Sequence, residues 1–434
     1  MARLLDCPLE VIQAVLQRLS PTDLYALCLT NKALRILAEP HLYSTIEWTW
    51  ERIHTPPPID LLLRSLLRRP ELSQHVRTLI IRGCLGFGNT TPPTTSTDAL
   101  DMDKVIQFIQ STTVPFVPLW IDEALGGTVD SLFTALVSQL SNITHLGLGS
   151  NLTHQSMLFG MMLRSALVRP TYCSLPNFQK LQKVTYSRNL EPRRYPAVRG
   201  YAGLAGSSSP DALSLFYLPA VQHISACITN PAVFSWPAYV PDPSTLTSLD
   251  ISMLREPHLG GLLRVTKSLQ KLRWQWWQEP MWGGITPIIN LEQLLDALSH
   301  VRETLTDLSL TGICSMNDGG NWPPLERRGS LRDMVGFHKL VQFRAPLAFF
   351  HSLPSNVEDV TIGDDFVDNE NYDWGEGDIF DLIRLWLETG KESTPSLRKL
   401  SYSLLETRPR WGSEMRAKMT EVCTRFGVEV DIIV

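Results

Sequence analysis

Residues 246–251 read Leu-Thr-Ser-Leu-Asp-Ile, and residues 269–274 read Leu-Gln-Lys-Leu-Arg-Trp. In each stretch the first, fourth and sixth residues are apolar, and the residues between them are polar. This alternation predicts a short strand with one buried side. Because the pattern returns after a spacer, we expect one structural unit to be repeated along the chain.

The same spacing recurs elsewhere after residue 75. Nine further copies complete a set of eleven and begin at Val76, Val114, Ile143, Leu181, Val221, Leu305, Leu340, Val357 and Leu397. Helical patterns lie between copies at 101–110, 129–140, 155–168, 259–268, 291–301, 331–340 and 379–387. A helix over 414–425 and an alternating stretch at 428–432 predict a C-terminal cap. Repetition of strand and helix predicts an α/β fold with a curved parallel sheet lined by helices.

The apolar spacing resembles the start of a leucine-rich repeat. Most units here exceed the ~20–29 residues of regular repeats, so the resemblance implies an irregular leucine-rich-repeat solenoid. A doubly wound α/β enzyme is the competing fold. The strands of such an enzyme are continuously apolar, whereas those predicted here are amphipathic, which favours the solenoid.

The N-terminal residues predict three short helices. The first follows Pro8 and carries a helical stripe of apolar residues. A second begins at the capping box Ser20-Pro21-Thr22-Asp23. Thr30 or Asn31 caps a third, which we expect Pro40 to end. Three helices of this length bury little apolar surface on their own, so the module requires a partner.

The same residues resemble an F-box, in the version common in fungal F-box proteins. The resemblance rests on residues 8–12, 19–24 and 29–32, and on residues 38–43, which read Ala-Glu-Pro-His-Leu-Tyr. The sequence departs from the family pattern at Cys7, where leucine is usual, and at Leu34, near where many members carry tryptophan. The alternative is a three-helix cap that only covers one end of the repeat array.

The resemblance implies a function in ubiquitin transfer. Members of that family dock on the Skp adaptor of an SCF-type cullin-RING ubiquitin ligase, and their repeats hold a protein target. Carried over to this chain, the adaptor-binding residues are Pro8, Leu9, Ile12, Leu16, Leu24 and Leu27. The expected organisation is an F-box-like module at 1–45, a connecting helical segment at 46–74, and the repeats with their cap at 75–434. The alternatives are a non-ligase leucine-rich-repeat scaffold, and an enzyme or enzyme activator on a repeat scaffold, such as a GTPase-activating protein.

Target binding is expected on the polar side of the strands. Four tryptophans lie between residues 274 and 282. We expect Trp274 in the core, and Trp276 and Trp277 at the strand end, where aromatic residues often anchor a partner. The candidate target-binding residues are Lys271, Arg273, Gln275, Trp276, Trp277 and Arg344. Their mixture of charge and polarity suits a protein better than a phosphate polymer. The acidic stretch 364–381 is a solvated loop or a contact for a basic partner.

Motifs of catalysis and cofactor binding are missing from the sequence. We find no Walker A loop, GxGxxG, GxSxG or HExxH, and the ten histidines lack metal-ligand spacing. The seven cysteines are scattered and form no CxxC pair, which is typical of a reducing compartment. The net charge of −5 gives no electrostatic footprint for nucleic acid. We therefore expect an intracellular non-enzyme without cofactor, metal, nucleic acid or membrane partner, located in the cytoplasm, the nucleus or both.

Overall fold

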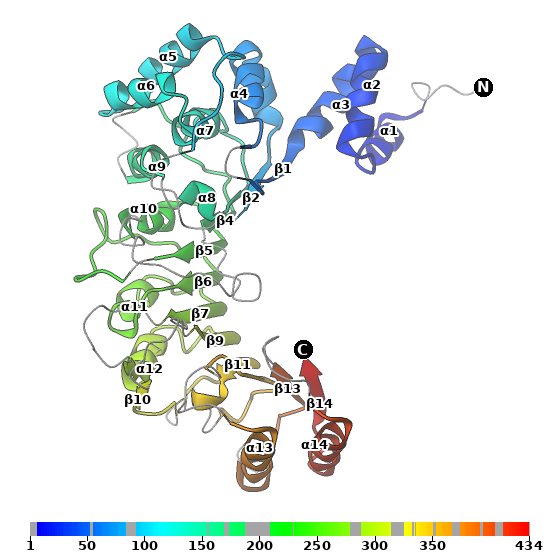
Figure 1. The fold of residues 1–434 in the computed structure, drawn as a ribbon, viewed down its shortest axis with the longest axis vertical. Coiled ribbons are helices and arrows are strands. Elements are labelled where there is room, and N and C mark those ends of the chain that lie inside the picture. Colours follow the sequence, from blue (N-terminus) through cyan, green and yellow to red (C-terminus); the bar gives the residue numbers. More distant parts are fainter. Residues whose placement is uncertain are drawn as a thin grey trace. The chain divides into compact units, whose positions relative to one another are not determined.

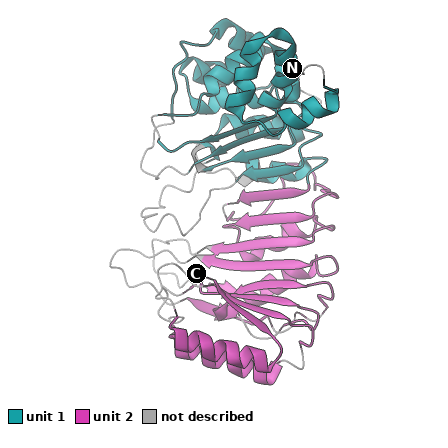
Figure 2. Ribbon diagram, turned by 90° about the vertical axis from the view of Figure 1, so that its right-hand side faces the viewer, with its two compact units in different colours: residues 1–189, 210–221 teal, residues 190–209, 222–434 magenta. Residues whose placement is uncertain are grey.

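The computed structural model describes residues 7–52, 55–83, 93–153, 156–168, 173–186, 209–228, 230–277, 288–313, 325–331, 334, 336–349, 353–366, 374–390, 394–403 and 411–433. The chain divides into two compact units (Figure 2). Unit 1 comprises Met1–Asn189 and Pro210–Val221, and unit 2 comprises Leu190–Ser209 and Gln222–Val434.

Unit 1 begins with three helices, α1 (Leu9–Leu16), α2 (Pro21–Thr30) and α3 (Lys32–Ser44). The side chain of Ser20 accepts a hydrogen bond from the backbone N–H of Asp23, and Asn31 caps α3 in the same way. The prediction that Pro40 ends the third helix is wrong, because α3 continues four residues further. Pro40 lacks the N–H that would donate to the carbonyl of Ile36. Because Ile36 is exposed on α3, water can replace that single hydrogen bond.

The rest of unit 1 alternates strands and helices. Its elements are β1 (Thr45–Thr49), α4 (Ile59–Arg68), the 3₁₀ helix η2 (Pro70–His75), β2 (Thr78–Arg82), α5 (Met102–Ser111), α6 (Val117–Leu125), α7 (Val129–Val137), β3 (His145–Leu148), α8 (Ser150–Thr153), α9 (Leu158–Val168), β4 (Lys183–Tyr186), α10 (Ser209–Ser214) and η5 (Leu215–Tyr217). The strands pair in parallel in the order β1, β2, β3, β4.

Unit 2 contains a longer parallel sheet. Its elements are β5 (His223–Cys227), β6 (Ser248–Ser252), α11 (Glu256–Leu263), β7 (Lys271–Trp277), β8 (Ile288–Asn290), α12 (Leu291–Ser299), β9 (Asp307–Ile313), β10 (Glu326–Arg328), β11 (Gln342–Pro346), η6 (Leu347–Phe349), β12 (Asp359–Gly363), α13 (Glu376–Gly390), β13 (Lys399–Ser403), α14 (Ser413–Arg425) and β14 (Glu429–Ile433). Neighbours in the sheet follow chain order, β5, β6, β7, β9, β11, β12, β13, β14, while β8 and β10 pair separately.

The register of unit 2 sorts its side chains onto two faces. In the main sheet, the second residue of each strand from β6 to β13 is large, apolar and buried, and these residues stand beside one another: Leu249, Leu272, Leu308, Phe343, Val360 and Leu400. Helices α11 and α12 lie on one side of β6, β7 and β9 (Figure 1). Because side chains alternate along a strand, the first and third residues of each strand face the opposite way.

The fold is therefore a mixed α/β structure with a long parallel sheet and helices. Ten of the eleven predicted strands are strands. The copy at Val114 is wrong, because its apolar residues continue into α6, where Trp120 and Ala124 are buried at helical spacing. A proline at the start of α6 suits a helix, since the N–H it lacks would have no partner there. The strands β1, β8 and β10 were not predicted.

The predicted helices are mostly present. The segment at 259–268 is shifted, since α11 starts at Glu256 and ends at Leu263. The predicted helix at 331–340 is wrong, because its described residues lie in turns and coil. Gly336 adopts φ +106° there, a conformation outside the helical region.

Candidate functional site

The N-terminal helices pack around a small apolar core. Ile12, Leu16, Leu24 and Ala38 are buried in it, and Leu27 packs partly buried against them. Three predicted adaptor-binding residues, Ile12, Leu16 and Leu24, thus lie inside the module. Their side chains face inward because they pack together with Ala38 of α3 in this core. Pro8 and Leu9 are exposed.

The same helices expose large apolar side chains to solvent. They are Leu9, Val11 and Val15 on α1, Tyr25 and Leu29 on α2, and Ile36 on α3, with exposed fractions between 39% and 69%. An exposed set of this kind on a small module is typical of a protein-binding surface. We call these six residues the apolar surface set. Of these six residues, the predicted adaptor-binding residues include only Leu9.

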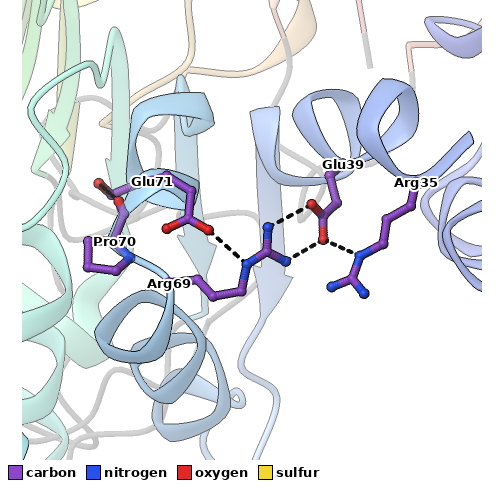
Figure 3. Close-up of polar contacts among 6 residues, drawn as sticks. Arg35, Glu39, Arg69, Pro70 and Glu71 are labelled. Atoms are coloured by element: carbon purple, nitrogen blue, oxygen red, sulfur yellow. Dashed lines mark hydrogen bonds and ion pairs between the residues drawn. The ribbon is translucent and has the colours of Figure 1, made fainter. Parts of the chain in front are cut away.

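An ion-pair network ties α3 to the segment that follows α4 (Figure 3). Arg69 donates from Nη1 and Nη2 to the two carboxylate oxygens of Glu39, at 2.6 and 2.9 Å, and from Nε to Glu71 at 2.9 Å. Arg35 donates to Glu39 at 3.0 Å. The hydrogen bonds from Arg69 are the main cause that lowers the pKa of Glu39 to about 2. The network therefore holds α3 against a part of unit 1 that lies thirty residues away in the chain.

A second candidate site lies on the polar face of the unit 2 sheet. It is a pocket of about 330 Å³ formed by β9, β11, β12 and β13. Its lining residues are Asp307, Ser309, Gln342, Phe343, Arg344, Asp359, Thr361, Lys399 and Ser401. Most of them are first or third residues of their strands, so the common register brings them together. We call this cavity the strand-face pocket.

The charges around the strand-face pocket are incompletely compensated. Nη2 of Arg344 lies 3.9 Å from Oδ1 of Asp365, and Nε of Arg344 meets no acceptor among the described residues. Nζ of Lys399 lies 3.7 Å from Oδ2 of Asp431. Burial raises the pKa of Asp307, against the opposing charge of Lys271 on the neighbouring strand. The pocket thus combines two carboxylates with two cations.

The predicted target-binding residues separate into three groups. Lys271 and Arg273 are exposed on β7, and Arg344 lines the strand-face pocket. Gln275 is buried, and the backbone of Trp277 ends β7 but its side chain lies outside the described residues. The expectation that Trp276 is an exposed anchor is wrong, because it is fully buried.

The burial of Trp276 follows from the length of β7. The strand continues past the repeat pattern, so Trp276 extends the alternation of Leu272 and Trp274 into the core. Its ring packs edge-on against Phe366, with the guanidinium of Arg255 over its face. The tryptophan therefore contributes to the stability of unit 2 from inside.

The acidic stretch 364–381 is only partly a solvated loop. Asp364 and Asp365 are largely buried at the end of β12, and burial raises the pKa of Asp365. Residues 367–373 lie outside the described residues. Glu376 and Asp378 occupy the first turn of α13, where negative charge interacts favourably with the positive end of the helix dipole.

Within the described ranges, no three His, Cys, Asp or Glu side chains gather as a metal site would require. None of the described helices has the length and apolar character needed to cross a membrane. A comparison with curated proteins finds no match. A family model described as the F-box domain matches residues 4–41. That match covers α1, α2 and most of α3, the helices that carry the apolar surface set, and it supports an F-box protein.

Proposed function

We propose that this chain is the substrate receptor of an SCF-type cullin-RING ubiquitin ligase. Its F-box binds the Skp adaptor, and its C-terminal part binds a protein target. The proposal includes a fungal-type F-box module at 1–45, a connecting segment at 46–74, and an irregular leucine-rich-repeat solenoid at 75–434. The observation that supports it best is the apolar surface set on helices that match the F-box model.

The receptor acts through proximity. Binding both the adaptor and a target raises the effective concentration of a target lysine near the conjugating enzyme. Such a receptor supplies no catalytic group itself, so the proposed role is not enzymatic. The Glu39–Arg69 ion pair supports this role, because a fixed α3 holds the adaptor-binding helices on the body of unit 1.

The adaptor contact is assigned to the apolar surface set rather than to the buried stripe. Leu29 and Ile36 are its most exposed members, at 69% and 62%. Changing both to aspartate places two charges in the proposed interface while leaving the module core intact. We expect a loss of roughly 3 kcal/mol, or more than 100-fold in affinity, from the lost apolar burial.

Co-expression with the Skp adaptor, followed by size-exclusion chromatography, tests the proposal. The matched control is Val233→Asp with Val240→Asp, two equally exposed apolar residues in unit 2, at 78% and 66%. We expect the wild-type chain and the control to elute with the adaptor, and Leu29→Asp with Ile36→Asp to elute alone. A wild-type chain that elutes without the adaptor would exclude the receptor role and favour the non-ligase scaffold.

A further inference from the structure

We propose that the strand-face pocket binds an extended target segment in which a basic and an acidic residue are separated by one residue. This inference rests on the proposed receptor function, since it names the chemistry of the target that the receptor holds. It follows from the order in which charged side chains stand across and along four neighbouring strands.

The first residues of the neighbouring strands form one row across the pocket, and the third residues form another. The first row carries an acidic residue on each side of a neutral one. Asp307, Gln342 and Asp359 stand side by side in register on β9, β11 and β12. Because adjacent strands lie ~4.8 Å apart, the two aspartates are separated by roughly 10 Å at their Cα atoms. Lys271 stands beside Asp307 in register and Lys399 beside Asp359, but neither carboxylate has an ion-pair partner within 4.0 Å among the described residues. One cationic side chain above Gln342 would lie between both carboxylates.

The third row presents a cation with unused donors. Arg344 stands between Ser309 and Thr361 in register, and Ser401 follows on β13. Its side chain is 33% exposed and its Nη2 lies 3.9 Å from Oδ1 of Asp365, too far for a hydrogen bond, whereas its Nε is buried. The exposed end of the guanidinium and the neighbouring hydroxyls can therefore donate to an incoming carboxylate.

The spacing of the two rows sets the spacing in the ligand. Gln342 and Arg344 are two residues apart on one strand, which is ~6.6 Å along its axis. Side chains two apart on an extended peptide have the same separation and point the same way. A peptide aligned with β11 would place its basic residue at the aspartate row and its acidic residue at Arg344.

The charge pattern disfavours ligands of a single sign. A polyanion would meet Asp307 and Asp359, and a polycation would meet Arg344 and Lys399. The cavity of about 330 Å³ lies at the lower end of ligand-site volumes, which run from ~300 to 1,000 Å³, and so suits two side chains rather than a folded surface.

Three synthetic peptides test the inference on the full chain. The first is Gly-Ala-Arg-Ala-Glu-Ala-Gly, the second exchanges Arg and Glu, and the third, Gly-Ala-Arg-Glu-Ala-Ala-Gly, has the same composition with adjacent charges. Ligand-observed NMR titration measures the dissociation constant of each. We expect one of the two spaced peptides to bind at least tenfold more tightly than the adjacent one. Equal affinities, or no binding of either spaced peptide, would overturn the proposal.

Two variants locate the binding. Arg344→Ala and Asp359→Asn should each remove the tenfold preference, while Lys267→Ala, an exposed change in unit 2 outside the pocket, should retain it. Asp359→Asn tests the pocket even if Arg344→Ala destabilises the fold by leaving Asp365 buried without its cation. Preference retained in a folded Asp359→Asn variant would place the peptide elsewhere. Adaptor binding is measured by co-purification for the same set of variants, so loss of the receptor role is detected independently of peptide binding.

Discussion

Replacing Glu39 with glutamine tests whether the ion pair with Arg69 fixes the N-terminal helices. The bidentate pair of hydrogen bonds from Arg69, together with the hydrogen bond from Arg35, lowers the pKa of Glu39 from 4.5 to about 2. At 1.36 kcal/mol for each pKa unit, this shift corresponds to roughly 3.4 kcal/mol as an upper bound. The Arg69 side chain is 36% exposed, so solvent screening reduces the figure. We expect Glu39→Gln to lower the free energy of unfolding of unit 1 by about 1–2 kcal/mol at pH 7.

The pH dependence has a definite sign. The folded-state pKa of Glu39 lies below its unfolded value, so the folded state favours the ionised carboxylate. The stabilisation is complete above about pH 5 and is lost as the pH falls from 4.5 toward 2. The difference between wild type and Glu39→Gln should therefore shrink over that interval.

Urea denaturation followed by tryptophan fluorescence measures these differences. Glu47→Gln is the matched control, because Glu47 also pairs with an arginine at 2.9 Å but both side chains are more than 40% exposed. We expect the control to change stability by less than ~0.5 kcal/mol. A double-mutant cycle with Arg69→Gln isolates the pairwise energy. A coupling energy no larger than that of the control pair, or a Glu39→Gln effect that does not change below pH 4.5, would refute the reasoning.

Three further predictions concern buried residues. Burial raises the pKa of Asp211 from 3.8 to about 6 despite the Arg164 charge, so wild-type stability falls as the pH rises through that range. Asp211→Asn should therefore stabilise unit 1 by roughly 3 kcal/mol at most at pH 7, and should have no effect below about pH 4. Urea titrations at both pH values measure this difference. Gly160→Ala should destabilise unit 1 by about 1–3 kcal/mol, since the new Cβ would collide with Oδ2 of Asp211, and thermal melts should show recovery when Asp211→Ala is added. Trp276→Ala should cost about 3–5 kcal/mol in the unfolding free energy of unit 2, whereas the exposed Lys271→Ala should change it by less than ~0.5 kcal/mol.

Local patterns in the sequence were sufficient for most of the elements. The caps Ser20 and Asn31 act on backbone groups within three residues of themselves, so the starts of α2 and α3 were predictable. The spacing of apolar residues quoted for residues 246–251 predicted most strands of both units, because the alternation of side chains is a property of each strand alone. The Val114 copy failed because the same apolar residues satisfy a helical period as well.

The amino-acid sequence alone determined the alternation of strands and helices and the apolar character of the N-terminal module. Only the tertiary structure decided which apolar residues face outward, since Val11 and Ile12 differ by their place relative to α2 and α3 rather than by chemistry. Likewise, the strand-face pocket gathers residues from four strands spread over nearly a hundred positions. Secondary-structure propensity and capping act within about four residues, whereas burial and the pairing of distant charges depend on how segments far apart in the sequence pack together.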